Sequence, residues 1–264
     1  MAETIRNNGD ARPKARRAID SMAPYRPPTG GRQELLRLDF NENTLGCSPK
    51  VREFLATSLN VCSLPAYPEY SETRRDLAAF FGVEEESLVL TNGTDEAIQV
   101  LVNTYLDDGQ ECLILQPAYA MYRFYAEVAG AEVFALDYNP DTLAFPLEQV
   151  LESISASTRL IMIANPNNPT GGAISLKAIE QILQRAGNAA VLIDEAYYEF
   201  CGVTALPLIK DYPNLFVSRT FSKVYGLAGL RIGCLFTQPA HAALLRKGQS
   251  PYSVNAGAAA AARA

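Results

Sequence analysis

The sequence predicts an α/β fold in which helices cover both faces of a mainly parallel central sheet. Short apolar segments alternate with segments that carry apolar residues at helical spacing, a pattern typical of parallel strands joined by helices. Several apolar segments, such as 159–164, contain almost no polar residue, as expected when both faces of a strand are buried. We therefore predict a three-layer αβα domain.

The elements follow one another in a regular order. Residues 1–34 are polar and basic and include "APYRPPTGGR", so we expect an extended arm without helix or strand. Apolar residues at helical spacing predict helices at 51–60, 73–81, 91–106, 117–130, 147–154 and 175–186. The apolar segments predict strands at 87–90, 112–115, 131–136, 159–164, 189–194, 214–218 and 231–236. Because alanine is the best helix former, the closing "NAGAAAAARA" predicts the start of a helix.

Composition excludes several classes of function. A chain of 264 residues can form one large domain, or a large domain with part of a second. The net charge of −6 gives no reason to expect nucleic acid or an anionic membrane as a partner, and no apolar run is long enough to span a bilayer. Five cysteines without a CxxC pair indicate reduced thiols of a cytoplasmic protein, and the single histidine, His241, argues against most metal sites.

Polar residues follow the predicted strands, where ligands bind in sheets of this kind. After 87–90 the chain continues as "TNGTDEAI", in which Thr94 or Asp95 suits the N-cap of a helix. The free amides and the helix dipole at that point could hold a phosphate. An ordinary capped helix explains the same residues without any ligand.

Two further strands end at candidate ligand residues. The turn "NPNNPTGG" after 159–164 is rigid, and its asparagines, among them Asn168, place amide donors at the sheet edge. Asp194 ends the next buried strand, and a carboxylate there is costly to bury unless a cation or strong donors meet it. A purely structural turn and a structural acid remain alternatives.

Lys223 follows the strand at 214–218 and is the most reactive candidate. Burial lowers the pKa of a lysine and frees its amine to form a Schiff base. Thr220, Ser222 and Arg231 add hydroxyl and guanidinium donors suited to a phosphate. The alternative is a lysine whose amine reaches water beside a turn.

Taken together, these groups describe one ligand. A carboxylate at Asp194 for a ring cation, an amide donor at Asn168 and an amine at Lys223 for an aldehyde match pyridoxal 5'-phosphate. The anion cradle that the phosphate needs is formed by Thr94, Asp95, Thr220, Ser222 and Arg231. No metal site is expected.

Seven segments follow in an order that identifies a family. They are "DFNENTLGCSP", "AYPEYSETRRDLAAFFGV", "TNGTDEAI", "PAYAMY", "NPNNPTGG", "DEAYYEF" and "RTFSKVYGLAGLRIG". With them the chain, from about Ala23 to its last residue, resembles the fold-type I aminotransferases and, within them, the histidinol-phosphate aminotransferase branch. This resemblance implies the aspartate aminotransferase-like fold, with pyridoxal 5'-phosphate as the cofactor.

The resemblance also implies a role for each matching residue. Lys223 binds the cofactor covalently and serves as acid and base, and Asp194 pairs with the pyridine nitrogen. Asn168 and Tyr197 donate to the phenolate oxygen, while Tyr119 stacks on the ring. The phosphate is held by Thr94, Asp95, Thr220, Ser222 and Arg231.

Other implied features concern assembly and domains. Tyr67 reaches the phosphate of a partner subunit in a homodimer, while Tyr25 and Asn43 lie where the arm closes over the substrate. We expect an arm at 1–34 and a cofactor-binding large domain at 35–250, of which 35–66 belongs partly to the arm or a small domain. Residues 251–264 are expected to start a helix leading to a C-terminal domain that is largely missing, together with the arginine that binds the substrate carboxylate.

Three functions remain open from the sequence. The first is a cytoplasmic transaminase that exchanges an amino group between a phosphorylated or aromatic amino compound and 2-oxoglutarate. The second is a lyase such as threonine-phosphate decarboxylase, which shares these motifs. The third is a fragment that binds the cofactor with little or no catalysis.

Overall fold

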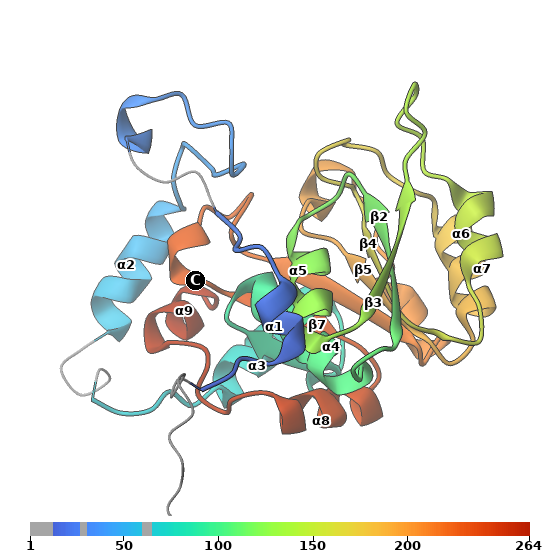
Figure 1. The fold of residues 1–264 in the computed structure, drawn as a ribbon. Helices are drawn as coiled ribbons and strands as arrows, with labels where there is room; N and C mark the ends of the chain where they lie inside the picture. The colour runs from blue at the N-terminus through green and yellow to red at the C-terminus, as the bar shows by residue number, and fades with distance from the viewer. Residues whose placement is uncertain (1–12, 27–30, 60–64) are drawn as a thin grey trace, which may run out of the picture.

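A computed structural model describes residues 13–26, 31–59 and 65–264 of the chain. Its sheet has seven strands in the order β1-β7-β6-β5-β4-β2-β3 (Figure 1). Strand β7 is antiparallel to both of its neighbours, and the other adjacent pairs are parallel. The strands are β1 (Leu88–Thr91), β2 (Glu111–Gln116), β3 (Glu132–Asp137), β4 (Thr158–Ala164), β5 (Ala190–Asp194), β6 (Leu215–Thr220) and β7 (Gly233–Phe236).

Helices cover both faces of this sheet and build two separate cores. One core joins α4, α5 and α8 to one face, and the other joins α3, α6, α7 and α9 to the opposite face. The helices are α1 (Arg17–Ser21), α2 (Pro49–Ser58), α3 (Ser71–Phe81), α4 (Gly93–Tyr105), α5 (Met121–Ala129), α6 (Leu147–Ser153), α7 (Leu176–Ala186), α8 (Pro239–Gly248) and α9 (Ala256–Ala261). The predicted three-layer α/β architecture is therefore confirmed.

Strand β4 shows why the apolar segments are continuous. Leu160 and Met162 face the core beneath α4 and α5, whereas Ile161 and Ile163 face the core beneath α7. All four side chains are fully buried. Because successive residues of a strand point to opposite faces, a strand with both faces covered needs an apolar residue at every position.

The predicted element boundaries lie within four residues of the observed ones. The helix predicted for 91–106 begins only at Gly93, the strand predicted for 231–236 only at Gly233, and the helix predicted for 117–130 only at Met121. The second difference arises because Arg231 has a left-handed backbone with φ of 57°, which a strand cannot contain. The arm is also not free of helix, since it holds α1 and a 3-10 turn at Arg32–Glu34.

The short helix α1 is held in place by tertiary contacts. It packs against α5, and Arg16 beside it donates to the carbonyl of Ala129 at 3.3 Å. Five residues of α-helix are too few to be stable alone, so this contact explains a helix that the polar arm sequence did not indicate. The expectation for residues 1–12 and 27–30 lies outside the described residues.

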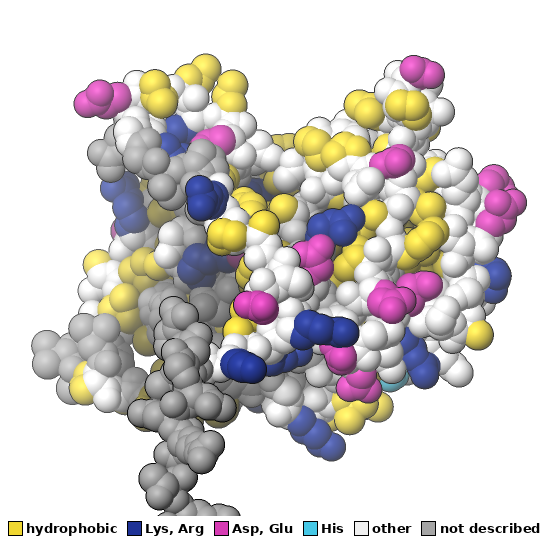
Figure 2. Space-filling view, viewed as in Figure 1, with side chains coloured by type: hydrophobic (Ala, Val, Ile, Leu, Met, Phe, Trp, Pro, Cys, Tyr) yellow, Lys and Arg dark blue, Asp and Glu magenta, His cyan; other side chains and the backbone are white. Residues whose placement is uncertain are grey.

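The segment that begins at the 3-10 turn Arg32–Glu34 projects from the body of the molecule (Figure 1). Its leucines are largely exposed: Leu35 by 67%, Leu36 by 82% and Leu38 by 75%. Figure 2 shows hydrophobic side chains on this projection and also elsewhere on the same face, among acidic and basic groups. Among the described residues, no helix is both long and apolar enough to cross a membrane.

Candidate cofactor site

The site lies at the edge of the sheet where parallel strands β4, β5 and β6 end. Pairing continues just beyond the strands, because the amide of Asn165 donates to the carbonyl of Asp194 at 2.8 Å. The amide of Glu195 likewise donates to the carbonyl of Ser218 at 3.0 Å. Residues that are far apart in the chain are thus held side by side at one edge, as expected for ligand sites in α/β sheets.

Asp194 is a buried carboxylate with hydrogen-bond donors on both oxygens. Tyr122 donates to Oδ2 at 2.7 Å, and Ser218 and the amide of Ala196 donate to Oδ1 at 2.8 and 3.2 Å. Burial raises the pKa of Asp194, and these donors oppose that rise. Among the described residues, none forms an ion pair with Asp194, so a ligand cation is the charge partner that this carboxylate lacks.

Lys223 lies in the turn after β6, three residues beyond Thr220, the last residue of that strand. Its Nζ donates to the carbonyl of Phe40 at 2.8 Å. Burial lowers the pKa of Lys223, and the charge of Arg231 lowers it further. The amine is therefore neutral at a lower pH than that of an exposed lysine, as a nucleophilic lysine requires.

Arg231, Asp95 and Ser222 lie together at the N-terminus of α4. Arg231 Nη2 is 2.8 Å from Asp95 Oδ2, and Nη1 donates to Ser222 Oγ at 3.4 Å. Tyr119 donates to the other oxygen of Asp95 at 2.7 Å. Thr94 follows Gly93 in the first turn of α4, where backbone amides and the helix dipole favour an anion.

The N-cap of α4 differs from the sequence expectation. Neither Thr94 nor Asp95 caps the helix, because it begins at Gly93 with Asn92 as the N-cap residue. The side chain of Glu96 accepts from the amide of Asn92 at 2.6 Å instead. Consequently Thr94 and Asp95 are not needed as caps.

Two glycines permit the close approach of α4 to Arg231. Gly93 has a positive φ of 74°, which favours glycine, and a Cβ there would meet the guanidinium of Arg231. A Cβ at Gly233 would lie 2.9 Å from the carbonyl carbon of Gly93. Because that contact is with backbone, a side chain at Gly233 would push β7 away from α4.

The buried hydroxyl of Thr220 orients the turn that carries Ser222. Its Oγ1 accepts from the amide of Ser222 at 3.1 Å, so both hydroxyls lie on the same turn beside Lys223. Arg231, Asp95 and Asp194 all act electrostatically on Lys223. The structure therefore brings the predicted anion cradle, the carboxylate and the amine together.

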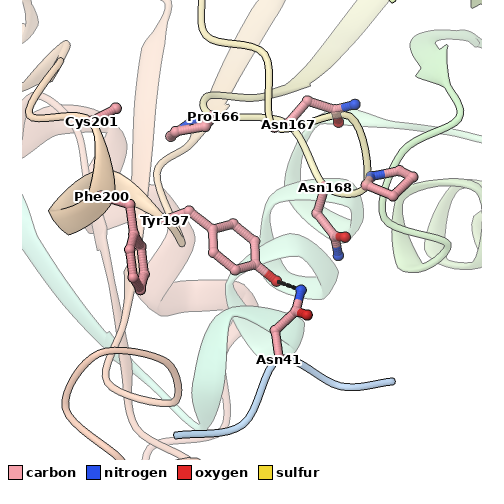
Figure 3. Close-up of a pocket in the computed structure, with 9 residues that line it drawn as sticks. Asn41, Pro166, Asn167, Asn168, Tyr197, Phe200 and Cys201 are labelled. Carbon is pink, nitrogen blue, oxygen red and sulfur yellow. Dashed lines mark hydrogen bonds between the residues drawn. The ribbon is translucent and has the colours of Figure 1, made fainter. Parts of the chain in front are cut away.

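Of the three asparagines after β4, only Asn168 has a side-chain amide donor without a partner among the described residues. Asn165 is committed to Ile174, and Asn167 donates to the carbonyl of Pro117 and to Thr170. The expectation that all three offer donors at the sheet edge is corrected accordingly. Asn168 lines a cavity of about 250 Å³ together with Asn41, Pro166, Asn167, Pro169, Gly171, Tyr197, Phe200 and Cys201 (Figure 3).

Three predicted residues are not part of this cluster. Tyr67 is 74% exposed and stacks on Tyr252, with the ring centroids 4.3 Å apart. Tyr25 is 50% exposed, in the stretch after α1. Asn43 does not line the cavity. It donates to the carbonyl of Val224 at 2.9 Å and so contacts the turn that carries Lys223, which we call the lysine turn. Their predicted roles with a partner subunit or a substrate remain predictions.

Sequence reasoning missed two groups that hold Asp194. Tyr122 lies three residues after Tyr119 on α5, and its side chain is 1% exposed. Ser218 is the residue of β6 that pairs with Asp194 in the sheet register. In the helix predicted for 117–130, Tyr122 lies three residues after Tyr119 and so on the same face, which could have indicated that it reaches the site. Ser218 could be found only once the pairing register of β5 and β6 was known.

A buried ion pair lies directly beside the site and was also missed. Arg219 Nε is 2.7 Å from Glu195 Oε2, and the two side chains are 4% and 0% exposed. Glu195 also accepts from Thr204 and from the amide of Ala205, at 2.9 and 2.6 Å. The guanidinium of Arg219 stacks on Tyr198 at 3.5 Å. This pair joins β6 to the segment that carries Tyr197.

Comparison with known proteins agrees with this geometry. Residues 33–264 match the model of the family aminotransferase class I and II. The chain belongs to this family. A relative, the histidinol-phosphate aminotransferase of Dehalococcoides mccartyi strain BAV1, is 39% identical over 235 residues, which are 88% of this chain and 63% of the relative. The chain thus spans less than two thirds of the length of that aminotransferase.

Solved aminotransferase structures show the same fold. A histidinol-phosphate aminotransferase from Sinorhizobium meliloti, in complex with pyridoxal 5'-phosphate, superposes with a TM-score of 0.86 at 23% identity and covers 96% of this chain and 71% of that one. The L-threonine-O-3-phosphate decarboxylase of Porphyromonas gingivalis has a TM-score of 0.72 at 25% identity, covering 84% of this chain and 67% of that one. The fold is therefore aspartate aminotransferase-like, as predicted.

The residues present fit pyridoxal 5'-phosphate, the cofactor that family membership supports. The buried carboxylate of Asp194 lacks a cation that the ring nitrogen would supply. Arg231, Ser222 and the first turn of α4 suit the phosphate, and the half-buried amine of Lys223 suits the aldehyde.

Proposed function

We propose that this chain is the cofactor-binding part of a transaminase of the histidinol-phosphate aminotransferase type. Its substrates would be a phosphorylated or aromatic amino compound and a 2-oxo acid such as 2-oxoglutarate. The observation that carries the proposal is the meeting of a half-buried lysine, a buried carboxylate without a cation, and an arginine at one edge of the sheet. The relatives of this chain that are named histidinol-phosphate aminotransferase support the substrate class.

Each residue has a role in the proposed reaction. Pyridoxal 5'-phosphate supplies an electron sink when it is bound. Lys223 would bind the aldehyde through Nζ and would move the substrate proton as acid and base. Tyr122 and Ser218 donate to Asp194 and favour its ionised form, which would stabilise a positive charge on the ring nitrogen. Asn168 and Tyr197 would donate to the phenolate oxygen, and Tyr119 would cover a ring face.

The phosphate would be held by charge and by backbone dipoles. Arg231 supplies a guanidinium, Ser222 a hydroxyl and Thr94 with Asp95 the amides of the first turn of α4. Thr220 keeps the Ser222 turn in place through its hydroxyl. These contacts would hold the cofactor in one orientation beside Lys223.

Lys223 is expected to be the residue that carries the cofactor. Borohydride reduction of the chain loaded with pyridoxal 5'-phosphate, followed by peptide mass mapping, should place the pyridoxyl group on Lys223 because burial makes its amine the most nucleophilic. The exposed Lys177 and Lys247 serve as internal controls. Labelling of either control in place of Lys223 would contradict the assignment.

We further infer a homodimer in which Tyr67 completes the site of the partner subunit. Two features support this. Tyr67 is 74% exposed and stacks on Tyr252, away from Lys223 and Asp194 of its own chain. The leucines of the projecting segment are also exposed. Apolar patches of this kind commonly mark interfaces.

We also infer a reducing, cytoplasmic location for the protein. The free cysteines among the described residues support this inference.

Mixing two defective variants tests the dimer. Lys223→Ala inactivates the site that contains it, and Tyr67→Phe weakens the phosphate site of the partner subunit. If Tyr67 acts across the interface, refolded mixtures should recover activity, because a heterodimer keeps one site in which both residues are native. The same mixing with Tyr252→Phe, the exposed stacking partner of Tyr67, is the control. A chain that is monomeric when loaded with cofactor would refute the dimer.

A decarboxylase remains the second candidate, favoured by the structural match to the threonine-phosphate decarboxylase. The two reactions differ in their products: a transaminase yields a keto compound and glutamate, whereas a decarboxylase releases carbon dioxide. Product analysis with histidinol phosphate and with threonine phosphate as donors separates them. The assay should use both this chain and a longer protein that spans the full length of the relatives.

A further inference from the structure

The arm residue Asn41 makes a direct contact with Tyr197. Asn41 Nδ2 donates to Tyr197 Oη at 3.0 Å, and both side chains line the cavity beside Asn168 (Figure 3). Asn41 has a left-handed backbone with φ of 52°, a conformation that asparagine tolerates better than most residues. The family resemblance implies a place at the site for Asn43 and none for Asn41.

Contacts on either side hold Asn41 in this position. The carbonyl of Phe40 accepts from Lys223 Nζ at 2.8 Å, and Asn43 donates to the carbonyl of Val224 at 2.9 Å. Arg32 pairs with Asp39 at 2.8 Å and with Glu42 at 2.9 Å. The segment 39–43 is therefore fastened to the lysine turn, and the amide of Asn41 is held against Tyr197.

This contact determines what the tyrosine hydroxyl can do. A phenol has one proton to donate, while its oxygen can accept. Because the oxygen of Tyr197 accepts from Asn41, its own proton remains free for another acceptor in the cavity. Burial raises the pKa of Tyr197, as does the charge of Asp194, and the hydrogen bond from Asn41 opposes that rise. A tyrosine so polarised is a stronger donor.

We propose that Asn41 is a positioning residue, which donates to Tyr197 Oη and thereby directs the tyrosine proton toward the phenolate oxygen of the cofactor. The proposal rests on the proposed function, since it assumes that Tyr197 donates to pyridoxal 5'-phosphate. It adds a link between the N-terminal arm and the electronic state of the cofactor. The arm then takes part in the chemistry as well as in covering the site.

The first test uses the chain without cofactor. Tyrosine labelled with ¹³C at Cζ reports the titration of each phenol by NMR, and Tyr197→Phe assigns the Tyr197 signal. Asn41→Gly removes the donor while keeping the left-handed backbone free of strain. The midpoint of Tyr197 should rise by about half to one pH unit, because a neutral hydrogen bond to the tyrosinate is lost. Asp194 and Lys223, the charged groups that face Tyr197, are unchanged.

A matched control separates the loss of the Asn41 hydrogen bond from a general loosening of the segment 39–43. Asn43→Ala removes an amide of the same type two residues away, at its contact with Val224. It should shift the Tyr197 midpoint far less than Asn41→Gly does, because Asn41 keeps its amide and is still held by the contacts of Phe40 and Arg32. An equal shift in Asn43→Ala, or no shift in Asn41→Gly, would overturn the proposal.

The second test uses the loaded chain and its visible absorbance. A donor to the phenolate oxygen lowers the pH at which the lysine-bound cofactor changes colour, so Tyr197→Phe and Asn41→Gly should both raise this midpoint. The double variant should shift no further than Tyr197→Phe alone, because Asn41 acts through Tyr197. Additive shifts would overturn the proposal. If the native chain binds no cofactor, the proposed function fails, while the tyrosine titration still decides whether Asn41 donates to Tyr197.

Discussion

Replacing Asp194 by alanine is expected to slow the transamination half-reaction by about three decades or more, while the chain still binds cofactor. The reason is electrostatic: Asp194 is buried and accepts hydrogen bonds on both oxygens, which favour its ionised form as the charge partner of the ring nitrogen. Without that charge the nitrogen loses its proton and the ring withdraws electrons poorly. Lys223 and the phosphate contacts are untouched, so binding persists. Single-turnover absorbance measurements give the rate.

Two further variants sharpen this prediction. Asp194→Asn keeps the shape of the side chain but removes the charge, so it should be nearly as slow as alanine. Asp137→Ala changes the carboxylate that ends β3, which is exposed and contacts Gln116 at 2.8 Å, and it should leave the rate unchanged. A half-reaction of near-native speed in Asp194→Ala would remove the proposed role of this carboxylate.

Replacing Arg219 by methionine is expected to lower the free energy of unfolding by about 3–5 kcal/mol. The change leaves Glu195, which is 0% exposed, without its cation. It also removes the guanidinium that stacks on Tyr198 and donates to Thr204. Chemical denaturation followed by fluorescence or circular dichroism measures the loss. Arg123→Met, which breaks an exposed pair with Glu127, is the matched control and should cost about 0.5 kcal/mol or less.

The loss in Arg219→Met should also depend on pH. Burial raises the pKa of Glu195 above its ordinary value of 4.5, and Arg219 opposes that rise. Removing Arg219 therefore raises this pKa further in the folded state. A raised pKa gives stability that is present below the unfolded value and is lost as pH rises through the folded value. The deficit should thus be smaller near the unfolded pKa than at neutral pH, and a deficit independent of pH would argue against an unpaired carboxylate.

The sequence predicted the layers of the fold because they follow from local patterns. A segment such as 159–164 is apolar at every position, and this is visible without knowing what covers it. Asp194 and Lys223 could be recognised because the ends of parallel strands meet at one edge of the sheet. The short helix α1 could not be predicted, since it depends on its packing against α5.

The sequence predicted the central groups of the cofactor site: a lysine, a carboxylate and an arginine at defined spacings after apolar strands. The groups that support them could be found only in the folded structure. Tyr122 reaches Asp194 across 72 residues, and Asn41 reaches Tyr197 across 156. Arg219 meets Glu195 through the pairing of β5 with β6. Such contacts depend on register, helix facing and the path of the arm, which local sequence patterns do not encode.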